Sequence, residues 1–151
     1  MRVLLQRVKQ ASVQVEEREI GAIGPGILVL LGITHEDGEE DIAWLVKKIT
    51  QLRIFKDEAG KMNQSVQDIG GGILVVSQFT LFGNAKKGNR PSYVRSARPE
   101  VAIPLYERFL TVLREAFQGP VATGEFGAMM EVSLINDGPV SLMIDSKERG
   151  F

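Results

Sequence analysis

Apolar and polar side chains alternate, at least in part, over residues 3–8 and again over residues 12–16. A period of two is typical of half-buried strands, so we expect a pair of strands here. Gly24-Pro25-Gly26 predicts a turn, and the nearly unbroken aliphatic run over residues 27–33 has the length and β-branched content of a buried strand. The fold is therefore expected to begin with strands.

Three- and four-residue spacings of apolar side chains indicate two amphipathic helices in the middle of the chain. The first is expected over residues 39–54, after acidic residues that suit the positive end of a helix, with an apolar face formed by Ile42, Leu45, Val46, Ile49 and Leu52. The second is expected over residues 101–117, with an inner face formed by Leu105, Phe109, Val112, Leu113 and Ala116. Both helices should cover a sheet.

Strand-like sequence flanks the second helix. Gly70-Gly71-Gly72, a predicted mobile hinge, leads into an apolar run over residues 73–82, and the runs 125–136 and 140–145 are interrupted by Asp137-Gly138-Pro139. Strands at both ends with two helices between them predict an α+β fold, in which a mainly antiparallel sheet is curled into a β-barrel-like core or packed in two layers, with two main helices on it. No strand is followed by the glycine pattern of a dinucleotide-binding fold.

Composition limits the class of protein. The 151 residues suit a single domain over 1–151, and the absence of cysteine excludes disulfides, a thiolate nucleophile and a cysteine-ligated metal. Arg2 and Arg7 interrupt the N-terminal apolar run before it could form a signal peptide or a membrane span, so we expect a cytoplasmic protein with no membrane contact.

Charge is distributed unevenly. The formal net charge is −1, yet residues 84–98 contain five basic side chains and no acidic one. This segment is a candidate phosphate-contacting loop, and Lys86, Lys87 and Arg90 are its candidate tRNA-binding residues. A solvated loop that keeps the protein soluble is an equally good interpretation of so short a cluster.

Few residues offer reactive chemistry. His35 is the only histidine and has no Ser or Asp partner that the sequence suggests, so we interpret it as structural and expect neither a catalytic triad nor a metal. Ser77-Gln78-Phe79-Thr80 ends an apolar run, and polar residues in such places often line sites. Taken alone, they are more often cross-strand hydrogen-bonding residues.

Taken together, the motifs carry a resemblance that covers residues 6–145. The segments VVSQFTLFG, KKGNRPSY and FGAMMEVSLINDGPVSLMID, with QRVKQASVQVE, IGPGILVLLGI and RIFKDEAGKMNQSV, closely resemble the D-aminoacyl-tRNA deacylase (D-tyrosyl-tRNA(Tyr) deacylase) family. The resemblance implies an ester hydrolase that releases a D-amino acid from the 3′-terminal adenosine of tRNA, needs no cofactor, and could also cleave glycyl-tRNA mischarged on tRNA(Ala).

The resemblance also implies a cis peptide bond between Gly138 and Pro139. In such enzymes the Gly-Pro carbonyls project into the active site of the partner subunit, hold the amino group of the substrate and exclude an L side chain. The implied assembly is a homodimer with cross-subunit active sites. Rejection of an enantiomer by rigid backbone makes physical sense where many side chains must be accepted.

Ser77, Gln78, Phe79 and Thr80 match the catalytic motif of the family, near the scissile ester. No general base for Thr80 is evident, and the resemblance favours hydrolysis assisted by the 2′-OH of the terminal ribose, with backbone amides around Phe79 and Thr80 as oxyanion donors. Ser141 replaces the Thr that the family usually has after Gly-Pro-Val, which should alter packing near the turn rather than remove activity.

Two other classes of function remain open at this point. One is a non-catalytic RNA-binding module, in which residues 84–98 hold phosphates and Phe82 or Tyr93 stacks on a base. The other is a hydrolase of small D-amino acid esters that uses the same fold. The first would bind deacylated tRNA without turnover, and the second would not need tRNA.

Overall fold

The computed structural model describes residues 1–150, so Phe151, the last residue of the predicted domain, lies outside the described part. The sheet and helix bounds within it, in chain order, are β1 Arg2–Val15, β2 Arg18–Ile23, β3 Gly26–Gly32, α1 Glu39–Gln51, β4 Phe55–Lys56, β5 Met62–Gln64, β6 Gly72–Ser77, the 3₁₀ helix η1 Phe79–Phe82, α2 Pro99–Ala116, β7 Val121–Thr123 and β8 Glu131–Asp145.

The long strand β1 organises the main sheet. Its first half pairs antiparallel with β3, its second half pairs antiparallel with β2, and its other edge pairs antiparallel with β8 along almost its whole length. The prediction of two paired strands over residues 3–16 was wrong, because these residues form one continuous strand that changes partner. On the far side of β3, strands β6 and β7 are added in parallel.

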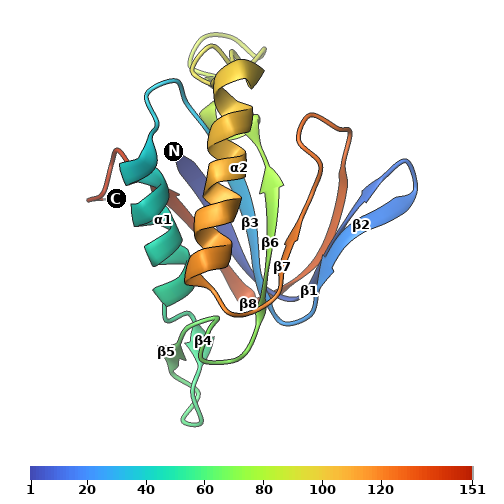
Figure 1. Cartoon of the computed structure of the whole chain (residues 1–151), viewed down its shortest axis with the longest axis vertical. Coiled ribbons are helices and arrows are strands. Elements are labelled where there is room, and N and C mark those ends of the chain that lie inside the picture. Colours follow the sequence, from blue (N-terminus) through green and yellow to red (C-terminus); the bar gives the residue numbers. More distant parts are fainter. Residues whose placement is uncertain (151) are drawn as a thin grey trace.

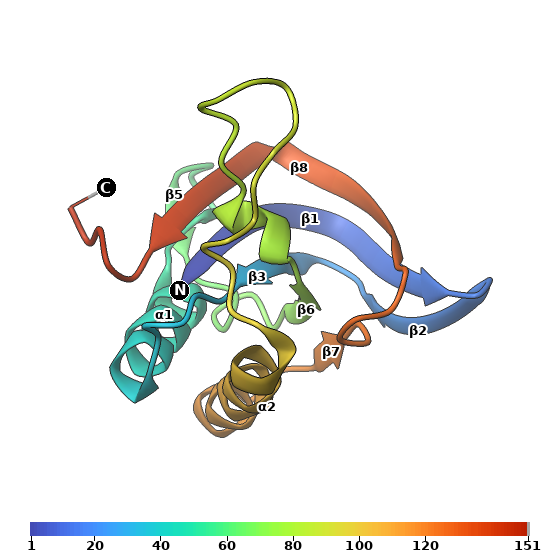
Figure 2. The same ribbon diagram turned by 90° about the horizontal axis from the view of Figure 1, so that it is seen from above.

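The sheet curls until its ends nearly meet, so the predicted α+β fold with a β-barrel-like core is confirmed. Figure 2 shows β1 and β8 curving together over the sheet, with β2 and β7 drawn towards each other. A Cβ atom on Gly21 of β2 would lie 2.7 Å from the carbonyl oxygen of Thr123 in β7. Only glycine permits this approach of the two backbones, which closes the curl.

Helices α1 and α2 lie side by side on one face of the sheet (Figure 1). The predicted apolar face of α1 is confirmed at Ile42, Leu45, Val46 and Ile49. The predicted face of α2 is confirmed at Phe109 and Leu113, while Leu105 and Val112 pack at the edge of the core and Ala116 is exposed. The buried face also includes Ala102, Tyr106 and Leu110. No helix within residues 1–150 is both long enough and apolar enough to cross a membrane.

Two predicted strands have different bounds in the structure. The run predicted over 73–82 leaves the sheet after Ser77 and turns into η1. The segment 125–130 is a loop, while β8 continues through Asp137-Gly138-Pro139 with an irregular register opposite β1. The predicted hinge at Gly70-Gly71-Gly72 includes two buried glycines, with Gly72 already in β6.

Buried charges join α1 to both ends of the described chain. The Met1 amino group donates hydrogen bonds to the Asp37 carboxylate and, at 2.9 Å, to Ser146 Oγ. Ser146 Oγ donates to Asp41 Oδ1 at 2.6 Å, and Lys147 Nζ donates to Asp41 Oδ2 at 2.8 Å. Burial favours the neutral acid, but the hydrogen bonds from Lys147, Ser146 and the Gly38 amide outweigh it and lower the pKa of Asp41 to about 2.

Replacement of Asp41 by Asn should therefore destabilise the protein. Asp41 is 4% exposed, and removal of its charge should lower the free energy of unfolding at pH 7 by about 1–3 kcal/mol. Because its pKa falls from 3.8 to about 2 on folding, this contribution is complete above pH 4 and disappears as the pH falls towards 2. Urea unfolding of both proteins from pH 7 to pH 2 measures the difference.

Glu40→Gln is the matched control, because Glu40 is an exposed neighbour that pairs with exposed Arg149 at 2.8 Å. Its effect should stay below about 1 kcal/mol. Equal effects of the two substitutions, or a difference that persists at pH 2, would contradict the role given to Asp41.

Candidate active site

The predicted catalytic motif lies where β6 leaves the sheet. Ser77 is the last residue of β6, and the Gln78 amide donates to the Leu31 carbonyl at 2.7 Å before the chain turns into η1. Gln78 Nε2 donates to Thr80 Oγ1, so the two side chains of the motif contact each other. Phe79 and Thr80 are exposed, while Ser77 and Gln78 are half-buried.

A hollow of about 270 Å³ and a smaller one of about 80 Å³ adjoin this motif, and Ser77, Gln78 and Phe79 line both. Their other walls include the loop between β7 and β8, with Gly127 in both and Met129 in the larger. Met129 is 90% exposed, which is unusual for an apolar side chain at the mouth of a cavity. No role was predicted for this loop from the sequence, although its segment FGAMM belongs to the stretches that resemble the deacylase family.

The η1 backbone is held from outside the sheet. Ser96 Oγ donates to the Phe79 carbonyl at 2.7 Å, and the Phe79 ring packs edge-on against Tyr93 at 5.2 Å between centroids. The amides of Phe79 and Thr80, at the start of η1, have no hydrogen-bond partner within residues 1–150. Free amides of this kind can donate to a developing oxyanion.

The basic loop over residues 84–98 lies directly beyond η1, at the top of Figure 1. Asn84 and Ser92 exchange backbone hydrogen bonds of 2.8 and 2.9 Å across its base, and Ser96 ties it to η1. Lys86, Lys87 and Arg90 are exposed, and none forms an ion pair in the described part of the chain. The structure thus places the predicted phosphate-contacting loop beside the motif.

The second motif forms a turn within β8. The Gly138-Pro139 bond is cis, as predicted, and both residues are exposed. Asn136 Nδ2 spans the turn by donating to the carbonyls of Arg7 and Val140, both at 3.1 Å.

A buried arginine holds this turn in place. Arg7 is 3% exposed, and its Nε donates to the Asp137 carbonyl at 3.0 Å while another nitrogen of its guanidinium donates to the Ile54 carbonyl. Asp137 also pairs with Arg7 through its carboxylate at 3.3 Å. From the sequence, Arg7 was expected only to interrupt an apolar run, because an arginine on a strand is usually solvent-exposed.

One chain does not bring the two motifs together. Ser77 of β6 is level with Val3 of β1, whereas Asn136 and Ser141 pair with Val8 and Gln6. The motifs are thus about four residues apart along the strands and three strand spacings apart across them, or roughly 20 Å along the sheet. Within one chain the two motifs therefore do not form a single site.

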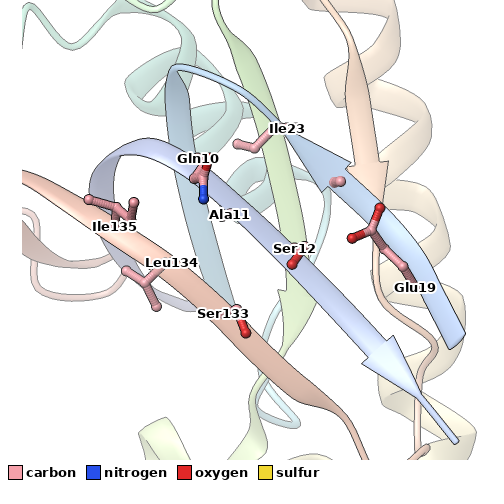
Figure 3. Close-up of a pocket in the computed structure, with 9 residues that line it drawn as sticks. Gln10, Ala11, Ser12, Glu19, Ile23, Ser133, Leu134 and Ile135 are labelled. Atoms are coloured by element: carbon pink, nitrogen blue, oxygen red, sulfur yellow. The ribbon is translucent and has the colours of Figure 1, made fainter. Parts of the chain in front are cut away.

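The other hollows of the described chain are lined by none of the predicted site residues. A groove of about 370 Å³ lies between β1, β2 and β8, where Figure 3 shows Ser12 and Ser133 near each other, but it contains none of the predicted site residues. His35 is exposed and forms no hydrogen bond to residues 1–150. Within that range no three acidic or histidine side chains are grouped to hold a metal ion.

Gly138→Ala should strain the turn. Gly138 has φ +117°, and a Cβ atom there would lie 2.3 Å from an Arg7 guanidinium nitrogen. The free energy of unfolding should fall by about 1–3 kcal/mol. Gly60→Ala is the matched control, because Gly60 has φ +77° but open space around its Cβ position. Denaturant unfolding that gives equal losses for both variants would mean that the contact with Arg7 contributes nothing.

Comparison with known proteins identifies the family. Residues 4–145 match the family model described as D-Tyr-tRNA(Tyr) deacylase. A D-aminoacyl-tRNA deacylase of Cytophaga hutchinsonii is 56% identical over 149 residues, and the match covers 99% of this chain and 99% of that protein. A D-aminoacyl-tRNA deacylase of Chloroherpeton thalassium is 57% identical over 146 residues, and the match covers 97% of this chain and 96% of that protein. A solved structure described as c-Myc DNA Unwinding Element Binding Protein has a TM-score of 0.91 at 44% identity and covers 96% of this chain and 98% of its own. This chain belongs to the D-Tyr-tRNA(Tyr) deacylase family.

Proposed function

We propose that this protein hydrolyses the ester bond of D-aminoacyl-tRNA and releases the D-amino acid and tRNA, as a proofreading enzyme. The observation that carries the proposal is the family match over residues 4–145, which includes both the Ser77–Thr80 motif and the Gly138-Pro139 turn. The D-aminoacyl-tRNA deacylases that resemble the chain do so over nearly their whole length, so both motifs belong to the shared part.

The two adjoining hollows beside Ser77, Gln78 and Phe79 are the proposed place of the ester and the 3′-terminal adenosine. The free amides of Phe79 and Thr80 would donate to the oxyanion that develops as the ester carbonyl is attacked. An aminoacyl ester is already activated, so positioning and oxyanion stabilisation can supply much of the acceleration.

Thr80 is not proposed as the nucleophile. Its hydroxyl accepts a hydrogen bond from the neutral Gln78 amide, which cannot take up a proton, and no histidine or carboxylate within residues 1–150 hydrogen-bonds to it. A nucleophilic hydroxyl needs an adjacent base. The 2′-OH of the terminal ribose therefore assists the attack of water, and Thr80 positions the substrate.

The active unit is a homodimer in which each Gly138-Pro139 turn enters the hollow of the partner. Support comes from the separation of the motifs in one chain and from the apolar side chains that β8 exposes, Ile135 at 49%, Leu142 at 37% and Met143 at 39%. A two-fold axis would use the same surface on both chains and complete two equivalent sites.

In this arrangement the Gly138 and Pro139 carbonyls bind the amino group and leave no space for an L side chain. The wall can be rigid because Arg7 and Asn136 hold the turn on both sides. It acts on the position of Cβ and not on side-chain identity, so glycyl-tRNA mischarged on tRNA(Ala), which has no Cβ, would not be excluded. Lys86, Lys87 and Arg90 would contact phosphates near the 3′ end.

A non-catalytic nucleic-acid-binding protein is the second candidate, favoured by the description of the 44% identical solved structure as a DNA-element-binding protein. It would use the basic loop and leave the hollow empty. The two candidates differ in whether aminoacyl-tRNA is consumed.

Purified protein treated with chelator should release D-tyrosine from D-tyrosyl-tRNA rapidly and leave L-tyrosyl-tRNA intact. The reason is the proposed backbone wall, and the measurement is release of labelled amino acid. Equal cleavage of both substrates would refute the role of the Gly138-Pro139 turn, and binding of tRNA without cleavage of either would favour the nucleic-acid-binding candidate.

Thr80→Ala should retain at least about a tenth of wild-type kcat on D-tyrosyl-tRNA, because loss of a positioning hydrogen bond costs about 1 kcal/mol. Thr111→Ala, an exposed threonine on α2, is the control and should match wild type. Loss of all turnover in Thr80→Ala alone, with the fold retained, would restore a covalent role for this hydroxyl.

Met143→Glu should dissociate the dimer and abolish turnover together, because it places a charge on the exposed face of β8. Sedimentation measures the first effect and amino acid release the second. Met62→Glu is the matched control on β5, since Met62 is 55% exposed and belongs to the separate two-stranded sheet of β4 and β5. A fully active monomer would refute the cross-subunit site.

A further inference from the structure

A pocket outside the proposed active site lies on the outward side of α1, towards its C-terminal end. Its volume is about 390 Å³, and its lining is Trp44, Lys47, Lys48, Gln51, Leu52 and Arg53. Half of these residues are cationic and none is acidic. The pocket therefore has the charge of an anion-binding site and contains an aromatic wall.

The cations of this pocket are not neutralised by ion pairs. Lys47, Lys48 and Arg53 are exposed, and none forms an ion pair in the part of the chain that the structure describes. Lys48 Nζ lies 5.5 Å from the centre of the Trp44 ring, which is half-buried against the core. The Arg149 guanidinium also lies over this ring, 5.2 Å from its centre. Several cations around a fixed indole suit the phosphate groups of a polyanion.

The pocket lies at the same end of the protomer as the Gly138-Pro139 turn. Arg7 donates to the carbonyls of both Ile54 and Asp137, so the residue after Arg53 and the residue before Gly138 share one guanidinium. The basic loop over residues 84–98 lies at the opposite end, beyond η1 (Figure 1). Each protomer thus has two basic regions, one at each end of the sheet.

We propose that the pocket around Trp44 binds the phosphodiester backbone of the tRNA whose 3′ end occupies the active site of the partner subunit. The proposal rests on the proposed function, because the cross-subunit arrangement brings the Gly138 end of one protomer to the Thr80 end of the other. The pocket of one chain and the loop over 84–98 of its partner then flank the same substrate. Together they give the acidic protein a basic track along the nucleic acid.

The single tryptophan makes occupancy directly measurable, because Trp44 is the only one in the chain. Titration of the wild-type protein with deacylated tRNA should change tryptophan fluorescence in a saturable manner. Lys48→Glu and Arg53→Glu should each weaken binding about ten-fold and reduce the slope of log affinity against log salt by about one.

Arg18→Glu is the matched control, since Arg18 is an exposed arginine at the β1–β2 turn, far from α1 in Figure 1. It changes the net charge equally and should leave both the affinity and the salt slope at wild-type values. Equal weakening by all three variants would reduce the effect to net charge and overturn the inference. Adenosine monophosphate that binds at Trp44 as tightly as tRNA would also overturn it, in favour of a pocket for a free nucleotide.

Turnover separates this inference from the proposed function. Lys48→Glu should lower kcat/KM about ten-fold more for D-tyrosyl-tRNA than for 3′-(D-tyrosyl)adenosine, which has no phosphate backbone. If the wild type turns over and the ratio of kcat/KM for the two substrates is the same in Lys48→Glu as in wild type, the pocket inference is overturned and the proposed function stands. Absence of wild-type turnover overturns the proposed function, and the fluorescence titration then decides by itself whether the pocket binds tRNA.

Discussion

The guanidinium of Arg7 joins parts of the protein that the chain separates widely. It lies on the central strand β1, is almost fully buried, and donates to a carbonyl after α1 and to another in the turn of β8. Burial of a cation is unfavourable unless it is paired and hydrogen-bonded, and the neighbouring Asp137 carboxylate supplies the opposite charge. The turn that carries Gly138-Pro139, the end of α1 and the basic pocket around Trp44 therefore have a common anchor in β1.

The curled sheet then explains where chemistry can occur. Parallel addition of β6 to β3 carries Ser77 to one end of the sheet, while the antiparallel return of β8 leaves Gly138 towards the other end. The two motifs therefore lie at separate places on one chain. Opposite placement of the two motifs is compatible with the proposed two-fold assembly, in which the axis can bring one end of each chain to the other end of its partner.

Periodicity in the sequence predicted local structure well and pairing poorly. The buried face of α1 followed directly from the spacing of Ile42, Leu45 and Ile49, because a helix buries residues that are close in the chain. The continuity of β1 could not be predicted, since exposed Lys9 and Gln10 interrupt the alternation where the strand changes partner. The motif residues were found through the family resemblance, whereas Arg7 and Trp44 gave no local signal because their roles depend on distant carbonyls and on the tertiary surface.

The close approach of Gly138 to Arg7 also limits how the sequence can change. A side chain at position 138 requires the guanidinium at position 7 to move, because the Cβ atom would lie 2.3 Å from one of its nitrogens. Shortening position 7 first removes the anchor of the turn before any compensation exists. Substitutions at the two positions should therefore be coupled, because each changes the effect of the other on the stability of the turn.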